Sequence, residues 1–258
     1  MDYQTIRLTQ TDGYAVITLA RADVMNALNT QMRAEILHAV KASETEARAI
    51  VLTGEGRAFC SGQDLGDRSS VANANLERTL RDEYEPLLRA IFDCQVPTIA
   101  AVNGPAAGAG ANLALAADVV IAAESAVFLQ AFTRIGLIPD AGGTYWLPRQ
   151  VGFARAMGAA LFAEPVSARQ AADWGMIWEA VADDGFEAHW RRRAATLAAG
   201  PTVAYRHAKE ALRASYGNSL EEQLLLEARL QGKCGMTRDF REGVLAFLEK
   251  RPAEYEGR

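Results

Sequence analysis

The stretch Ala101-Val102-Asn103-Gly104-Pro105-Ala106-Ala107-Gly108-Ala109-Gly110-Ala111-Asn112-Leu113 contains the main indication of the fold. Its first residues end the apolar run Thr98–Val102, which predicts a strand buried on both faces. The small residues of the following loop lead into a helix expected from about Ala109 to Ala116. Such a loop lets a ligand approach backbone N–H groups at a helix N-terminus, where the potential is positive. A tight turn packed by glycine produces the same pattern, so the stretch alone leaves both interpretations open.

A second loop of similar character lies earlier in the chain. The apolar run Ala49–Leu52 predicts another buried strand, and Gly56-Arg57-Ala58-Phe59-Cys60-Ser61-Gly62-Gln63-Asp64-Leu65 follows it. One backbone N–H from each loop would form a two-donor oxyanion hole, which stabilises negative charge on a carbonyl oxygen. The two loops are therefore interpreted as one candidate site.

Strands and helices alternate around these loops, which predicts an α/β fold. Strands are expected at Tyr3–Leu8, Tyr14–Leu19, 49–52, 98–102, 118–122 and 126–129, with a turn at Asp12-Gly13. Helices are expected at 31–47, capped by Asn29 or Thr30, at 76–92, at 109–116, and after Ser167. After Val181 the pattern is almost entirely helical, at 185–199, 201–214, 219–230 and 237–250. We therefore divide the chain into an α/β core, 1–195, and a helical region, 196–258, that covers the site or builds an oligomer interface.

Composition narrows the class of protein. The 258 residues are 50% hydrophobic and 23% charged, a balance typical of a folded globular protein. The formal net charge of −5 and the absence of a Lys/Arg-rich run argue against a nucleic-acid partner. No apolar run reaches the length of a membrane span, and the N-terminal residues do not resemble a secretory signal. Cys60, Cys94 and Cys234 form no disulfide pattern, so a cytoplasmic location is expected.

Several common catalytic signatures are absent from the sequence. No Gly-Lys-Ser/Thr follows the glycines of the 103–113 loop, and Leu113 occupies the third glycine position of a dinucleotide fingerprint. Phe59 stands where a nucleophile elbow needs glycine before Ser61. The three histidines, His38, His189 and His207, have no partner at metal-ligand spacing, and Cys60 has no adjacent base. We therefore predict no metal, and we interpret Cys60 as a packing residue.

The two loops, taken together, resemble those of the enoyl-CoA hydratase/isomerase (crotonase) superfamily. The resemblance extends over nearly the whole chain and includes the segments Arg21–Leu28, Phe59–Leu65, Asn103–Leu113, Ile138–Thr144, Arg241–Gly243 and Phe247–Arg251. It implies a spiral of ββα units with a helical C-terminal region, assembled as trimers that often pair into hexamers. It also implies an acyl-CoA thioester substrate, with coenzyme A as part of the substrate and no further cofactor.

The resemblance also assigns expected roles to particular residues. The backbone N–H groups of Gln63 and Ala109 would hold the thioester oxygen. Residues expected to bind CoA or substrate are Arg21, Ala22, Val24, Ser61, Asp64, Leu65, Asn112 and Phe132.

Hydratases of this superfamily use two glutamates, and this chain departs from that pattern. Asn112 and Phe132 stand at the two positions, and neither an amide nor a phenyl ring can act as a carboxylate base. One acid, Asp140, lies nearby between Pro139 and Gly142-Gly143, where isomerases of the superfamily have a proton-shuttling carboxylate. Apolar neighbours such as Phe132, Leu137 and Ile138 are expected to raise its pKa by desolvation.

A single carboxylate and an oxyanion hole predict an isomerase, because a proton removed at one carbon can be returned at another without added water. Within the superfamily, the loops from Phe59 to Arg68, Gly108 to Leu113 and Gly136 to Asp140, with Trp174–Trp178, look closest to the isomerases of phenylacetate degradation. These rearrange a ring-1,2-epoxyphenylacetyl-CoA to an oxepin-CoA, and Phe132, Tyr145 and Trp146 would suit a ring. The alternatives are a Δ3,Δ2-enoyl-CoA isomerase, a hydratase-like enzyme and a non-catalytic CoA-binding protein.

Overall fold

A six-stranded sheet forms the centre of the molecule in the computed structural model, which describes residues 2–66 and 75–258. Its strands run in the order β1-β2-β3-β4-β6-β9, and every neighbouring pair is parallel except the hairpin β1–β2. The strands span Ile6–Thr11 (β1), Tyr14–Leu19 (β2), Ala49–Gly54 (β3), Thr98–Val102 (β4), Val119–Ala123 (β6) and Glu179–Val181 (β9). The α/β class predicted from the alternating pattern is therefore confirmed.

The first strand begins later than the sequence predicts. Asp12 and Gly13 both have positive φ, as the predicted turn requires, and the ladder pairs Ile6 with Leu19. The residues before Ile6 are drawn away from the ladder, because the backbone N–H groups of Gln4 and Thr5 donate to the Glu35 carboxylate at 2.8 Å. The observed strand has the predicted length of six residues and is shifted three residues toward the C-terminus.

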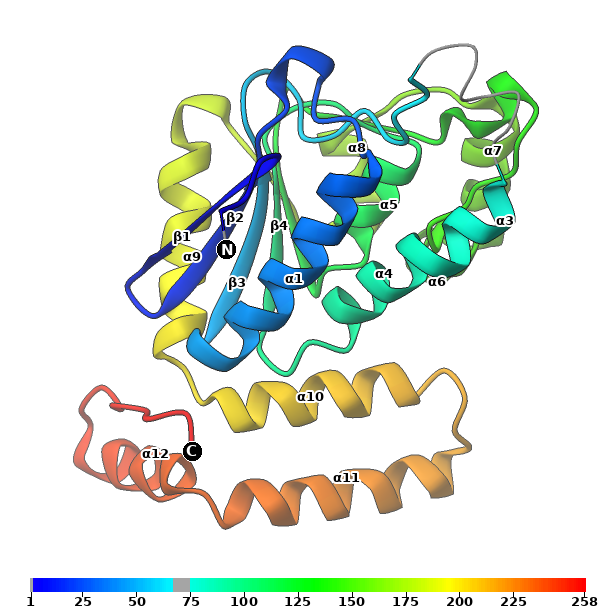
Figure 1. The fold of residues 1–258 in the computed structure, drawn as a ribbon. Helices are drawn as coiled ribbons and strands as arrows, with labels where there is room; N and C mark the ends of the chain where they lie inside the picture. The colour runs from blue at the N-terminus through cyan, green and yellow to red at the C-terminus, as the bar shows by residue number, and fades with distance from the viewer. Residues whose placement is uncertain (1, 67–74) are drawn as a thin grey trace.

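Helices cover both faces of the sheet (Figure 1). The helices that precede β9 are α1 (Thr30–Glu46), α3 (Leu76–Thr79), α4 (Glu85–Phe92), α5 (Ala109–Leu115), α6 (Gly143–Val151), α7 (Phe153–Phe162) and α8 (Ala168–Asp173). The short turns are η1 (Ala22–Val24), the π-helical η2 (Leu80–Tyr84), η3 (Ala131–Ile135) and η4 (Asp183–Gly185). The Asn29 side chain caps α1 and the Ser167 side chain caps α8, as predicted.

Alternate residues of the strands point to two separate hydrophobic cores. Tyr14, Val16 and Ile99 face α9 (Phe186–Ala199), whose Phe186 and Trp190 complete that core. The opposite face of the sheet packs against α1, α4 and α5 and carries the larger core. The candidate site lies at the N-terminus of α5.

A small second sheet positions the loop before α5. It consists of β5 (Ala106–Ala107), β7 (Val127–Leu129) and β8 (Val166–Ser167) in the order β5-β7-β8. The N–H of Gly108 donates to the Leu129 carbonyl at 2.8 Å, directly after β5. The N-terminus of α5 is therefore fixed by hydrogen bonds on the loop that precedes it.

The last three helices form a separate layer beneath the sheet (Figure 1). They are α10 (Thr202–Ala214), α11 (Leu220–Gly235) and α12 (Arg238–Glu249), which confirms the predicted helical C-terminal region. The expected division at residue 195 falls inside α9, which packs on the sheet. The change from one layer to the next therefore lies at Gly200-Pro201. None of the helices among the described residues is long and apolar enough to cross a membrane.

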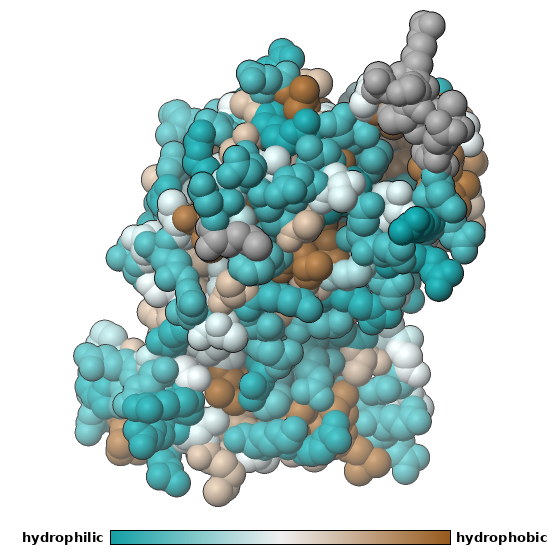
Figure 2. Space-filling view, in the orientation of Figure 1, coloured by the Kyte–Doolittle hydropathy of each residue, from teal (hydrophilic) through white to brown (hydrophobic). Residues whose placement is uncertain are grey.

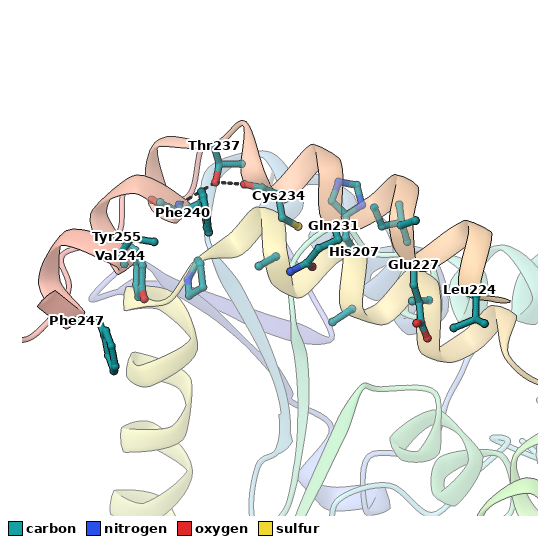
Figure 3. Close-up of a pocket in the computed structure, with 18 of the residues that line it drawn as sticks. His207, Leu224, Glu227, Gln231, Cys234, Thr237, Phe240, Val244, Phe247 and Tyr255 are labelled. Carbon is teal, nitrogen blue, oxygen red and sulfur yellow. Dashed lines mark hydrogen bonds between the residues drawn. The ribbon is translucent and has the colours of Figure 1, made fainter.

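The C-terminal layer exposes many apolar side chains. Figure 2 shows them as brown patches along the lower edge of the molecule, where Figure 1 places this layer. A groove of about 1020 Å³ runs between α10, α11 and α12, with His207, Leu224, Gln231, Phe240 and Phe247 among its lining (Figure 3). Such a surface is unusual for a helix layer that remains exposed to water.

Candidate active site

A cavity of about 270 Å³ lies where the two glycine-bearing loops meet. It opens beside the first turn of α5 and is walled by α3, η2, η3 and the loop that precedes α6. Its lining residues are Ser61, Gly62, Gln63, Leu65, Leu76, Thr79, Leu80, Tyr84, Gly108, Ala109, Ala131, Phe132, Arg134, Ile135, Leu137 and Asp140. The cavity is predominantly apolar, and Asp140 is the sole acidic group among the described residues of its wall.

The two loops touch through their backbones. The N–H of Ala107 donates to the Cys60 carbonyl at 2.9 Å, so the loops pair like neighbouring strands. Gly62 has φ of 97°, and a Cβ there would lie 2.8 Å from the Ala107 carbonyl oxygen and 3.4 Å from the Ala109 nitrogen. Glycine is therefore required at position 62 both for the backbone conformation and for this close approach.

The pairing of Gln63 with Leu28 determines where its N–H points. Leu28 donates to the Gly62 carbonyl at 2.8 Å and accepts from the Asp64 N–H at 3.1 Å. In a parallel bridge of this kind, the N–H of the residue between these two points to the other side of the strand. Gln63 and Ala109, the first residue of α5, both line the cavity, and the Ala109 N–H belongs to the unpaired donors of a helix start. Within residues 2–66 and 75–258, neither N–H has a hydrogen-bond acceptor.

Asp140 lines the same cavity. Burial raises the pKa of its carboxyl group to about 6. Its Oδ1 is buried and has no hydrogen-bond partner among the described residues. A buried acceptor without a partner is costly, and it is typical of a group kept free for a ligand or for proton transfer.

Asn112 lies behind the Asp140 loop and does not line the cavity. Its Nδ2 donates to the Asp140 carbonyl at 2.8 Å, and its Oδ1 accepts from Gln130 Nε2 at 2.9 Å. Gly143 packs so closely on this amide that a Cβ there would lie 2.4 Å from Asn112 Nδ2. The structure therefore gives Asn112 the position of a support for the Asp140 loop, in contrast to the expected contact with substrate.

The segment expected to bind CoA lies beside the loop that contains Gln63. Arg21 Nη1 contacts Asp64 Oδ2 at 2.8 Å, and the Ser61 hydroxyl donates to the Val24 carbonyl at 3.2 Å. Ala22 and Val24 are exposed in η1, where they leave an open surface next to this ion pair. Of the residues expected to bind CoA or substrate, Ser61, Leu65 and Phe132 line the cavity. Arg21 and Val24 are joined to the same loop through Asp64 and Ser61.

One residue expected to desolvate Asp140 and two expected to suit a ring-bearing acyl group do not line this cavity. Ile138 is 76% exposed, so it does not desolvate the carboxylate, whereas Leu137 and Phe132 do line the cavity. Tyr145 and Trp146 line a different cavity with Phe92, between α6 and α10. Neither residue is among those that line the cavity of Asp140, although Trp146 Nε1 donates to the Ala141 carbonyl at 3.4 Å, so their expected contact with a ring-bearing acyl group stays a prediction.

Sequence reasoning missed the residues of η2 that line the cavity. Tyr84 is 3% exposed, and its hydroxyl donates to Gln63 Oε1 at 2.6 Å. Leu80 and Thr79 precede it on the same wall. The sequence contains only a helical period over this segment, and a π-helical turn changes which residues face the cavity. Asp67 and Arg68, quoted above with the neighbouring loop, lie outside the described residues.

Other reactive side chains lie away from this chemistry. Burial raises the pKa of the Cys60 thiol, which is fully buried and contacts the Asn26 carbonyl, so its interpretation as a packing residue agrees with the structure. The histidines contact Tyr3, Glu179 and Glu210 at separate places. Among the described residues, no group of three or more His, Cys, Asp or Glu side chains is arranged to hold a metal ion.

Comparisons with known proteins agree with this geometry. The family model described as enoyl-CoA hydratase/isomerase matches residues 9–258. The chain is 65% identical to a probable enoyl-CoA hydratase of Rhodobacter capsulatus, over 100% of both chains. It is 44% identical to the 1,2-epoxyphenylacetyl-CoA isomerase of Escherichia coli, over 95% of this chain and 96% of that protein.

Solved structures show the same fold. The crystal structure of a putative enoyl-CoA hydratase/isomerase from Mycobacterium abscessus superposes with a TM-score of 0.93 at 36% identity, covering 98% of this chain and 100% of that one. The expected spiral α/β architecture with a helical C-terminal region is thereby confirmed. The chain belongs to the enoyl-CoA hydratase/isomerase family, the crotonase superfamily.

Proposed function

We propose that the chain is an acyl-CoA isomerase that uses Asp140 as its single proton carrier. The N–H groups of Gln63 and Ala109 would hold the thioester oxygen and stabilise the enolate that forms when a proton leaves the neighbouring carbon. Asp140 would take that proton and return it to another carbon of the acyl group. The proposed reaction consumes no water and needs no cofactor beyond the CoA of the substrate.

The buried, unpartnered Oδ1 of Asp140 is the observation that carries this proposal. The residue lines the same small cavity as Gln63 and Ala109, and its pKa of about 6 suits a base near neutral pH. Each feature supports proton transfer, and their coincidence in one cavity distinguishes the site from an ordinary aspartate in a Pro/Gly turn.

Hydration is the alternative suggested by the relative at 65% identity, which is called a probable enoyl-CoA hydratase. Activation of water by two carboxylates would need a second acid facing the cavity. The Asn112 amide donates to the Asp140 carbonyl, and the Phe132 side chain in the cavity wall is a phenyl ring, so neither supplies a carboxylate. These two residues favour isomerisation over hydration.

We infer a ring-bearing acyl group as the substrate, as in the 1,2-epoxyphenylacetyl-CoA isomerase that is 44% identical. The apolar side chains of Leu80, Phe132 and Leu137 suit an aromatic or oxepin ring. The second candidate, a Δ3,Δ2-enoyl-CoA isomerase, is favoured by the same base and the same pair of N–H donors, because both reactions pass through an enolate.

Proton exchange tests the chemistry before the substrate is known. Wild-type protein incubated with phenylacetyl-CoA in D₂O should incorporate deuterium next to the thioester, as measured by mass spectrometry. Asp140→Asn should lose this exchange while it still binds the ester by calorimetry. Asp173→Asn, which changes an exposed carboxylate at the end of α8, is the matched control.

Two further assays separate the reaction classes. A panel of epoxyphenylacetyl-CoA and linear 3-enoyl-CoA esters identifies the acyl group, and crotonyl-CoA reports hydration through loss of its enoyl absorbance. Exchange that persists in Asp140→Asn would refute the assigned base. Efficient hydration of crotonyl-CoA by the wild type would refute the isomerase assignment.

We also propose that the protein assembles as a homotrimer or as a pair of trimers, as the resemblance implies. The exposed side chains of α11 and α12, including Leu224, Phe240 and Phe247, would be covered in such an assembly. Sedimentation equilibrium measures the mass directly, and a monomer at micromolar concentration would contradict this expectation. The cytoplasmic location stays a prediction.

A further inference from the structure

A buried arginine lies behind the loop that contains Gln63. The side chain of Arg33, on α1, is 3% exposed, and its five hydrogen bonds go to Glu83 Oε2 (twice), Leu28 O, Gln63 Oε1 and Thr30 Oγ1. Burial of a guanidinium is expensive unless its donors are satisfied. Two of these acceptors, Leu28 and Gln63, are the paired residues that orient the proposed oxyanion donor.

Gln63 is held by its side chain as well as by its backbone. Its Oε1 accepts from the Tyr84 hydroxyl at 2.6 Å and from Arg33 Nη1 at 2.9 Å. The Arg33 guanidinium also lies over the Tyr84 ring, 4.8 Å from its centroid. The backbone on the other side of the residue is fixed by the bridge to Leu28. Gln63 therefore has little freedom to rotate its N–H away from the cavity.

The helix geometry explains how Tyr84 reaches this position. Residues Leu80–Tyr84 form a π-helical turn between the α-helical segments α3 and α4. The wider turn changes the angular position of the residues after it, and such turns are frequent at functional sites. Here the turn directs Tyr84 toward Gln63 and places Glu83 beside Arg33.

We propose that Tyr84 and Arg33 are positioning residues that hold the N–H of Gln63 toward the thioester oxygen. This inference rests on the proposed function, since it assumes that the Gln63 N–H binds that oxygen. It assigns to the buried ion pair Arg33–Glu83 a role in orienting a catalytic donor from α1 and η2. Neither residue needs to contact the reacting atoms for this role.

Polarisation of a bound thioester carbonyl is the direct readout. Phenylacetyl-CoA labelled with ¹³C at the thioester carbon, bound to wild-type protein, should show a lowered infrared C=O stretching frequency. Tyr84→Phe should return the frequency toward that of the free ester. Gln63→Met removes the side-chain acceptor but keeps the backbone N–H, and it should have the same effect. Each should slow deuterium exchange by about ten- to a hundredfold, because a misplaced donor loses part of its stabilisation. Tyr14→Phe, a buried tyrosine on the α9 face of the sheet, should change neither.

A double-mutant cycle tests whether Tyr84 acts through Gln63. The combined variant Tyr84→Phe/Gln63→Met should exchange no more slowly than the slower single variant, because both changes remove the same contact. Additive losses would overturn the inference in favour of a direct contact between Tyr84 and substrate. An unchanged carbonyl frequency in both single variants would also overturn it, whatever their stability.

The wild-type result separates this inference from the proposed function. A wild type that neither lowers the carbonyl frequency nor exchanges deuterium refutes the proposed function and the inference with it. If the wild type lowers the carbonyl frequency and exchanges deuterium, and the variants do so to the same extent, only the positioning role is refuted. The dependence of exchange on pH should be the same in Tyr84→Phe and in the wild type if Asp140 remains the base.

Discussion

The carboxyl group of Asp140 stays protonated to a higher pH than that of an ordinary aspartate, because burial raises its pKa to about 6. A base must be ionised, so the proposed exchange should be slow at pH 5 and should rise about tenfold per unit until it levels above the pKa. The exchange rate measured between pH 5 and 8 with phenylacetyl-CoA checks this expectation. A rate that is flat across this range would exclude Asp140 as the titrating base.

The same group is expected to lower the stability of the folded chain. The pKa of this carboxyl group is about 6 in the folded state and near 3.8 in the unfolded state, so the folded state holds the proton more tightly. The unfolding free energy therefore falls as pH rises through this window and stays low above it. Asp140→Asn should stabilise the protein by about 1 to 2 kcal/mol at pH 7.5, a value reduced for partial exposure.

Urea unfolding at two values of pH tests this linkage. The gain of Asp140→Asn should disappear at pH 4, because most of the carboxyl groups are then protonated in the folded state. The exposed control Asp173→Asn should be neutral at both pH values. Destabilisation by Asp140→Asn at pH 7.5 would show that the carboxylate makes a favourable contact in the folded state.

The residues alone indicated two glycine-bearing loops that could supply backbone N–H donors. The resemblance to the superfamily assigned the donors to Gln63 and Ala109 and the base to Asp140, and the structure places all three residues on one cavity. Arg33 and Tyr84 were not predicted, because an arginine on an amphipathic helix is usually exposed and a tyrosine is usually part of a core. Their roles depend on a contact between α1 and η2 that no local pattern contains.

Elements were predicted best where one pattern dominates. Strand β2 agrees with its predicted range Tyr14–Leu19, and the Asn29 cap marks the start of α1. Helices α6 and α7 were not predicted, since Pro148 lies inside α6 and Gly152 separates the two. Without α6, the sequence could not show that Tyr145 and Trp146 line a cavity between α6 and α10.

The close contact between the two loops predicts a severe effect at Gly62. Alanine there would combine a φ of 97° with a Cβ 2.8 Å from the Ala107 carbonyl oxygen. Gly62→Ala should cost about 2 kcal/mol or more of stability and should separate the two N–H donors. Deuterium exchange with phenylacetyl-CoA should then fall by about a hundredfold, the loss expected for one oxyanion donor.

A matched glycine provides the control for this prediction. Gly158 lies inside α7, and a Cβ there meets no atom within 4 Å. Gly158→Ala should be neutral or slightly stabilising by urea unfolding, because alanine is the better helix former. Wild-type exchange by Gly62→Ala would show that the loops can separate without disturbing the donors.

At the scale of the whole molecule, a partly buried ionic cluster joins the C-terminal layer to the sheet. Asp118, next to β6, contacts Lys209 and Arg213 of α10 at 2.6 Å each and accepts the N–H of Thr98. Lys209 also donates to the Cys94 and Val96 carbonyls. The attachment of α10 therefore depends on charges as well as on apolar packing.

Removal of the central charge should loosen this layer before the sheet unfolds. Asp118→Asn leaves two cations with reduced compensation, so we expect a loss of about 2 to 4 kcal/mol. Hydrogen exchange followed by mass spectrometry should show faster exchange in α10 than in β3 and β4, which stay protected by the core. Glu85→Gln, which breaks an exposed pair with Arg89 within α4, should cost less than about 0.5 kcal/mol. Equal acceleration in α10 and β4 would instead mean that the two layers unfold as one cooperative unit.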